Sequence, residues 1–249
     1  MLIPVLLAFL LPIAMAHPCG DAPAHAHVSD LKLAISWPWS SPAGSGGALD
    51  SRHASGVDLS DDAFADEGLR AEVFSLALTA WKKGWDKGDT KKKVLTVIDY
   101  SLPSDQHRLW LIDLETGKLL FHERVAHGKN TGGKLAKWFS NVSDSKKSNL
   151  GVLKTAETYM SGKFGYSLRL DGLEKGFNHN ARRRAIVMHR APYATDEWVD
   201  RHGRLGRSWG CPALDPKVTD AIIDTIKGGT LIFGYAKQDD WLRNSDYLN

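Results

Sequence analysis

Cysteine is scarce in this chain, with only Cys19 and Cys211 among 249 residues. So few cysteines exclude a disulfide-rich scaffold. No closely spaced Cys or His pair accompanies Cys211, which argues against a structural zinc site there. One disulfide between Cys19 and Cys211 stays possible in an oxidising compartment. The alternative is that Cys211 is an unpaired thiol available for chemistry.

Several other features are missing. Beyond residues 2–13, no apolar run is long enough to span a membrane. The net charge is only +3, and the basic runs at 91–93 and 182–184 are short and separate, so nucleic acid is not favoured as a partner. No glycine-rich strand-to-helix fingerprint for a phosphate cofactor is present. We expect no metal and no cofactor, and the oligomeric state is left open.

The N-terminus has the pattern of an export signal. Residues 2–13 are apolar and end in Ala14, Met15 and Ala16, a small-x-small cleavage pattern. We therefore expect residues 1–16 to be a signal peptide and the mature protein to be periplasmic or secreted. Residues 17–59 are rich in Ala, Pro, Gly, Ser and His and predict a flexible linker.

From residue 60 the pattern predicts a folded domain of class α+β, mainly β, up to residue 240, with residues 241–249 as a tail. A cap residue and acids at 60–67 predict a helix that ends near 84–88. β-Branched and alternating runs predict strands at 94–98, 108–114, 118–125, 150–159, 166–170, 185–189 and 230–235. Asp215 and Pro216 predict the start of a second helix. Long loops at 128–149 and 191–209 are candidates for function.

Cys211 lies between Gly210 and Pro212, shortly before the second predicted helix. A helix N-terminus and nearby arginines lower the pKa of a thiol, which predicts a reactive thiolate. The N–H groups of Gly210 and Cys211 are candidates for an oxyanion hole. These features favour Cys211 as a nucleophile.

A cysteine nucleophile needs a base nearby in space. His189 ends the apolar strand at 185–189 and is the preferred candidate, with His202 as the rival. No Asp or Glu is suitably placed in the sequence to orient the imidazole. The backbone carbonyl of Arg190 is therefore the candidate for that role.

The sequence around these residues resembles the L,D-transpeptidase catalytic domain family. A histidine, a spacer of more than a dozen residues and the motif Ser208-Trp-Gly-Cys211 form its signature. The murein L,D-transpeptidase branch is matched more closely, over roughly residues 95–236. The matching blocks are VIDYSLP (97–103), LWLIDLETGK (109–118), VAHGKN (125–130), YSLRLDGLEKGFN (166–178) and GRLGRSWGCPAL (203–214).

The resemblance implies a curved β-sandwich or partly open barrel with one packed helix and an N-terminal helix. It also implies that Cys211 forms an acyl-enzyme on stem tetrapeptides of peptidoglycan, with His189 as base and Ser208 and Gly210 shaping the turn. Release of D-alanine and cross-linking of third-position residues would follow. An L,D-carboxypeptidase that uses water as acceptor, and a non-catalytic peptidoglycan-binding protein, are the alternatives.

The stem carries free carboxylates, so cationic side chains are candidates for binding it. Arg204, Arg207 and the run at 182–184 are such candidates, although plain solubility explains that run equally well. His202, besides being the rival base, is also a candidate for substrate binding. The remaining candidates are aromatic side chains that could line a groove: Tyr159, Tyr166, Tyr193 and Trp209.

Overall fold

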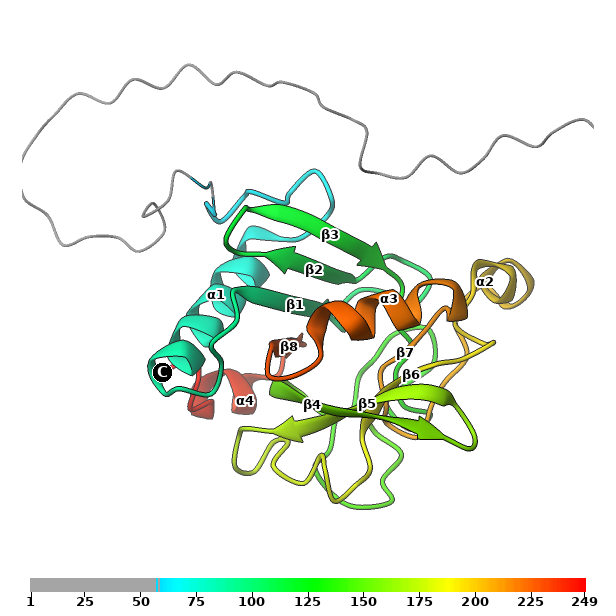
Figure 1. Ribbon diagram of the computed structural model, residues 1–249. Helices are drawn as coiled ribbons and strands as arrows, with labels where there is room; N and C mark the ends of the chain where they lie inside the picture. Colours follow the sequence, from blue (N-terminus) through cyan, green and yellow to red (C-terminus); the bar gives the residue numbers. More distant parts are fainter. Residues whose placement is uncertain (1–56, 58) are drawn as a thin grey trace, which may run out of the picture. The chain divides into compact units, whose positions relative to one another are not determined.

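The computed structural model describes residue 57 and residues 59–249 (Figure 1). The predicted signal peptide, nearly all of the predicted linker, and Cys19 lie outside the described residues. Within them, no helix is long and apolar enough to cross a membrane.

The core of the fold is one mixed sheet of eight strands in the order β3-β2-β1-β8-β4-β5-β6-β7 (Figure 1). The strands are β1 (Val94–Asp99), β2 (Leu109–Asp113), β3 (Lys118–Glu123), β4 (Gly151–Ser161), β5 (Gly165–Gly172), β6 (Val187–Arg190), β7 (Ala213–Leu214) and β8 (Leu231–Tyr235). The pairs β1–β8 and β6–β7 are parallel and the others antiparallel. The predicted class, α+β and mainly β, is confirmed. All eight strands are continuous in one sheet, as in the partly open barrel that the resemblance implies, rather than in two separate sheets.

Two helices cover the sheet and supply much of its apolar packing. Helix α1 (Ala71–Asp86) packs on β1 and β8, and helix α3 (Pro216–Ile226) packs on β5 and β6. Both helices turn an apolar stripe inward, with Val73 and Phe74 buried in α1 and Ile222 and Ile226 buried in α3. Asp215 caps α3 by accepting a hydrogen bond from the backbone N–H of Lys217, as its position before Pro216 predicts.

The start of the first helix was predicted about ten residues too early. Residues 61–68 form turns, and α1 begins only at Ala71. Gly68 has φ +76°, a left-handed conformation that interrupts a right-handed helix. The polar cap signal at residue 60 therefore begins a turn rather than the helix.

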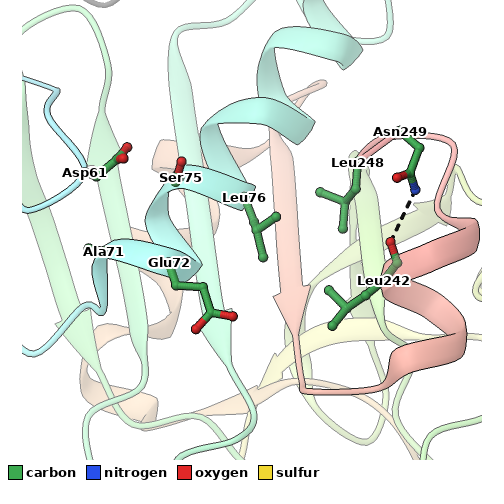
Figure 2. Close-up of a pocket in the computed structure, with 8 residues that line it drawn as sticks. All are labelled: Asp61, Ala71, Glu72, Ser75, Leu76, Leu242, Leu248 and Asn249. Atoms are coloured by element: carbon green, nitrogen blue, oxygen red, sulfur yellow. Dashed lines mark hydrogen bonds between the residues drawn. The ribbon is translucent and has the colours of Figure 1, made fainter.

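The chain end is part of the domain, so the predicted boundary at residue 240 is wrong. Helix α4 (Asp239–Asn244) follows β8, and Trp241 and Tyr247 are buried in the core. Figure 2 shows the Asn249 side chain turned back to the Leu242 carbonyl, to which it donates a 3.2 Å hydrogen bond, beside a hollow between α1 and the last residues. The side chains of Trp241 and Tyr247 are removed from water here by packing on the core. The sequence of residues 241–249 did not predict this burial, because most of these residues are polar.

Besides α4, two short elements were not predicted, and both precede or follow the candidate nucleophile closely in the chain. Strand β7 has only two residues, and helix α2 (Asp196–His202) lies within the predicted loop 191–209. Pairing in register joins Tyr159 of β4, Ser167 of β5, His189 of β6 and Ala213 of β7 into one row across the sheet. The sheet thus brings residues 159, 189 and 213 to one place, although 54 positions separate the first from the last.

Candidate functional site

A tight turn at residues 208–211 holds Cys211 at the start of β7. The Ser208 hydroxyl donates a 2.6 Å hydrogen bond to the Cys211 carbonyl and accepts a 3.0 Å bond from the Gly210 N–H. The N–H of Ser208 in turn donates to the His127 carbonyl at 3.0 Å. Ser208 therefore joins both ends of the turn, which is the shaping contact that the sequence predicts for it.

Only glycine fits at position 210. Its φ is +130°, and a Cβ there would lie 2.8 Å from the Lys147 carbonyl oxygen and 3.0 Å from Cδ1 of Ile186. The backbone on either side of Cys211 is thus held between two chain segments.

The oxyanion role predicted for the Gly210 N–H conflicts with this geometry, because that N–H is already bonded to Ser208. Within the described part of the chain, the Cys211 N–H interacts only with its own sulfur. The Cys211 amide is therefore the donor that stays available for an oxyanion.

Cys211 carries a free, partly exposed thiol. Its Sγ accepts a hydrogen bond from the Val187 N–H at 3.5 Å and lies 3.7 Å from the Ala185 carbonyl oxygen. Burial raises the pKa of this thiol, against the opposing effects of the Val187 N–H and the Arg184 guanidinium. The predicted lowering by a helix N-terminus is wrong, because β7 separates Cys211 from α3, which begins only at Pro216.

Arg184 is the arginine whose charge acts on the nucleophile, and the sequence did not distinguish it within the run 182–184. Its guanidinium donates to the carbonyls of Ser140 and Lys147, both at 2.6 Å, and to Oδ1 of Asn149 at 2.8 Å. Burial lowers the pKa of Arg184, and the neighbouring Cys211 opposes that shift. The arginine thus holds the loop before β4, and its charge acts on the thiol.

His189 lies on the strand next to the cysteine turn, as the sequence predicts. Its backbone N–H donates to the Pro212 carbonyl at 3.4 Å, and its ring stacks on Phe164 with centroids 3.9 Å apart. The ring atom Nδ1 lies 2.8 Å from the Arg190 carbonyl oxygen. A carbonyl only accepts, so Nδ1 carries the proton and Nε2 of the neutral ring is left as the base. The predicted orienting contact of Arg190 is present.

The thiol and the imidazole are neighbours without a direct bond. Because His189 pairs with Ala213, the same parallel register continued by two residues places Cys211 beside Val187, as the bond between these two confirms. Among the hydrogen bonds of residues 59–249, none joins Sγ of Cys211 to the His189 ring. Burial lowers the pKa of His189. At neutral pH both groups are uncharged, so the site is a thiol beside a neutral base, and such contacts often tighten only when substrate binds.

Two of the aromatic candidates lie near Cys211, and a third lies two strands from His189. Trp209 is 68% exposed beside Cys211, and Tyr159 shares the sheet row of His189. Burial raises the pKa of Tyr193 to about 12, and the negative charge of an ionised Cys211 contributes to this rise. The hydroxyl of the fourth candidate, Tyr166, instead donates to Asp224 on α3 at 2.8 Å.

The structure does not bring the remaining predicted substrate residues to the thiol. Arg207 donates to the carbonyls of Lys129 and Gly132, and Arg204 donates to the Leu205 carbonyl. The Arg190 side chain forms an ion pair with Asp220 of α3, so only its backbone serves the site. These three guanidinium groups therefore bind groups of the protein itself.

His202, the rival base, has a local role at the end of α2. Its Nδ1 lies 2.9 Å from the Trp198 carbonyl oxygen and its ring stacks on Trp198, with centroids 4.2 Å apart. The side chain is exposed, and no contact joins it to Cys211 or His189 within the described residues.

The raised thiol pKa has a measurable consequence. In a Cys19→Ser background, we expect the rate of Cys211 alkylation by iodoacetamide to rise with pH through a midpoint above that of free cysteine. The thiolate is the reacting form, and burial shifts its formation to higher pH. Mass spectrometry of the alkylated protein at each pH measures the rate. A rate already at its plateau at neutral pH would show a stabilised thiolate and contradict this site description.

Comparison with known proteins places the chain in a family. The sequence profile described as the L,D-transpeptidase catalytic domain matches residues 65–235, more than half of the chain. No curated protein sequence matches the chain.

Solved structures that resemble the chain carry related names. An L,D-transpeptidase from Mycobacterium smegmatis is 16% identical, with 58% of this chain and 59% of that chain covered and a TM-score of 0.38. One from Stackebrandtia nassauensis is 19% identical, with 66% of each chain covered and a TM-score of 0.35. The assignment rests on the profile match, because both TM-scores are low. Since that match includes the Cys211 turn and His189, the chain belongs to the L,D-transpeptidase catalytic domain family.

Proposed function

We propose that this protein is a cysteine-dependent L,D-transpeptidase acting on the stem peptides of peptidoglycan. The observation that carries the proposal is the free thiol of Cys211, bonded to the N–H of Val187 on the strand of His189, whose Nδ1 is held by the Arg190 carbonyl. This arrangement leaves Nε2 to take a proton from the thiol. Membership of the family supports the reaction class.

The first half of the proposed reaction acylates the cysteine. Sγ of Cys211 attacks the carbonyl of the diamino acid that precedes the terminal D-alanine, and its proton passes to Nε2 of His189. The N–H of Cys211 holds the oxyanion of the tetrahedral intermediate. The C–N bond then breaks, and D-alanine leaves with the proton that His189 returns. A thioester on Cys211 results.

The second half transfers the acyl group. The side-chain amine of a second stem attacks the thioester carbonyl, loses a proton to His189, and forms the new amide. The thiolate leaves and takes up that proton, which restores the starting site. With water in place of the amine, the same steps make the enzyme an L,D-carboxypeptidase.

Incubation of the purified protein with tetrapeptide muropeptides tests the proposal. We expect release of D-alanine together with dimers joined between third-position residues, measured by liquid chromatography with mass spectrometry. Release without dimers would instead support the carboxypeptidase. Retention of muropeptides with neither product would support a non-catalytic binding protein and overturn the proposal.

We also propose that the protein works outside the cytoplasm, in the periplasm or as a secreted protein. The apolar run at 2–13 followed by Ala14, Met15 and Ala16 supports export. The N-terminal residue of the protein isolated from cells tests this idea, and an intact Met1 would contradict it.

A further inference from the structure

Two lysines from separate loops meet over one exposed tryptophan beside the nucleophile. The Nζ atoms of Lys146 and Lys163 lie 4.7 and 5.5 Å from the ring centroid of Trp209. Trp209 directly precedes the Gly210–Cys211 pair and is 68% exposed. The face of an aromatic ring attracts cations, and both ammonium groups lie within cation–π range of this one ring.

Lys146 is held in place by a strained backbone. Its φ is +55°, a left-handed conformation that is costly for a residue with a side chain. Its carbonyl accepts a 3.0 Å hydrogen bond from the Asn130 N–H and lies 2.6 Å from where a Cβ on Gly128 would stand. Strain of this kind persists only where the surroundings enforce it and is concentrated at functional sites.

Lys163 is held by the turn between β4 and β5 and sits close to the predicted base. Oγ of Ser161 accepts hydrogen bonds from the N–H groups of Lys163 and Phe164, both at 3.3 Å. The Lys163 ammonium also lies 5.2 Å from the ring centroid of Phe164, which stacks on His189. Burial lowers the pKa of His189, and the positive charge of Lys163 lowers it further.

Neither ammonium group has a carboxylate partner within residues 59–249. Five other lysines do form ion pairs there: Lys82, Lys93, Lys134, Lys217 and Lys227. A ring face leaves the three N–H donors of an ammonium group free for a hydrogen-bonding ligand. Two like charges held near one ring repel each other, and a bound anion relieves that repulsion.

We propose that Lys146 and Lys163, gathered over Trp209, form a binding site for a carboxylate of the stem peptide that acylates Cys211. The proposal rests on the proposed function, because it identifies the ligand through the peptide processed at this cysteine. It assigns to these lysines the role that the sequence suggested for Arg204 and Arg207, whose guanidinium groups are bonded to backbone carbonyls. A stem offers two such groups, the terminal carboxylate of D-alanine and the side-chain carboxylate of a diamino acid.

Calorimetric binding to a Cys211→Ala background tests the proposal without turnover. The ligands are a synthetic stem tetrapeptide with both carboxylates free and two versions, each with one carboxylate amidated. We expect Lys163→Met and Lys146→Gly each to lower the affinity for the peptide with both carboxylates free about tenfold. This is the effect of losing one charge-assisted hydrogen bond. One amidated peptide should bind the parent and both lysine variants with equal affinity. The carboxylate that is amidated in that peptide is the one that the lysines bind.

Two controls separate lost binding from lost structure and from lost charge. Glycine suits φ +55°, so Lys146→Gly should unfold at a Tm no lower than that of the parent. Lys118→Met removes the same charge from exposed β3, at the other end of the sheet order, and should bind as the parent does.

The outcomes distinguish this proposal from the proposed function. Unchanged affinity of both lysine variants for the free peptide would overturn the carboxylate site, even if the wild type turns over muropeptides. Equal weakening by Lys118→Met would also overturn it, because general charge would then explain the effect. If the wild type forms no thioester but the affinity depends on the lysines, the enzyme proposal fails and the carboxylate site stands.

Discussion

Replacement of Cys211 by serine is expected to lower the rate of D-alanine release from tetrapeptide muropeptides by at least about a thousandfold. A serine hydroxyl at this position would depend on His189 alone for activation and is a far weaker nucleophile than a thiol. The substitution keeps the size of the side chain and leaves the Ser208 bonds of the turn in place. The Tm should therefore change little.

Cys19→Ser is the matched control, since it removes the other thiol and should leave the rate unchanged. Intact-protein mass spectrometry adds a second measurement, because an acyl adduct should form on the wild type and on Cys19→Ser only. If Cys211→Ser retained the wild-type rate, the acyl-enzyme mechanism would be wrong.

Replacement of His189 by glutamine is expected to lower kcat/KM by about a hundred- to ten-thousandfold, the range for loss of a general base. The Nδ1–H bond to the Arg190 carbonyl leaves Nε2 as the proton acceptor, and glutamine has no basic nitrogen to replace it. The same substitution at His202 should leave kcat/KM near the wild-type value, because that ring bonds to its own helix.

The pH dependence of kcat/KM distinguishes a base from a residue that only maintains the structure, because only the titration of a base changes this profile. Burial lowers the pKa of His189, so the ring is neutral at neutral pH and becomes protonated only in more acidic solution. The wild-type kcat/KM should therefore fall on the acid side, below the ordinary histidine pKa, and this fall should disappear in His189→Gln. A large loss in His202→Gln with a small loss in His189→Gln would reverse the assignment of the base.

Much of the fold was predictable because its strands are coded locally. The β-branched run at 94–98 and the turn at 115–117 between two apolar runs predicted β1, β2 and β3 nearly to the residue. Strand β7 was not predictable, because two residues show no alternation and exist as a strand only through pairing with β6. The start of α1 was missed because a cap signal at residue 60 also suits a turn, and the left-handed Gly68 decides between them.

The candidate nucleophile and base were predicted from local motifs, and their catalytic roles stay predictions. A cysteine after a glycine, and a histidine at the end of an apolar strand, are sequence features, and both residues lie where those features suggest. The direction of the Cys211 pKa shift was predicted wrongly, because the length of chain before α3 and the burial of the sulfur are tertiary properties. The choice among arginines failed for the same reason, since only packing reveals that the charge of Arg184 acts on the thiol.

The sequence by itself determined the strand pattern except for β7, the candidate pair Cys211 and His189, and the glycine that the turn requires at 210. Only the tertiary structure decided which charges surround that pair. Lys146 and Lys163 come from loops at opposite ends of β4, and both approach the ring of Trp209. The physical reason is that residue type and spacing encode local conformation, whereas burial and electrostatic environment depend on segments that are distant along the chain.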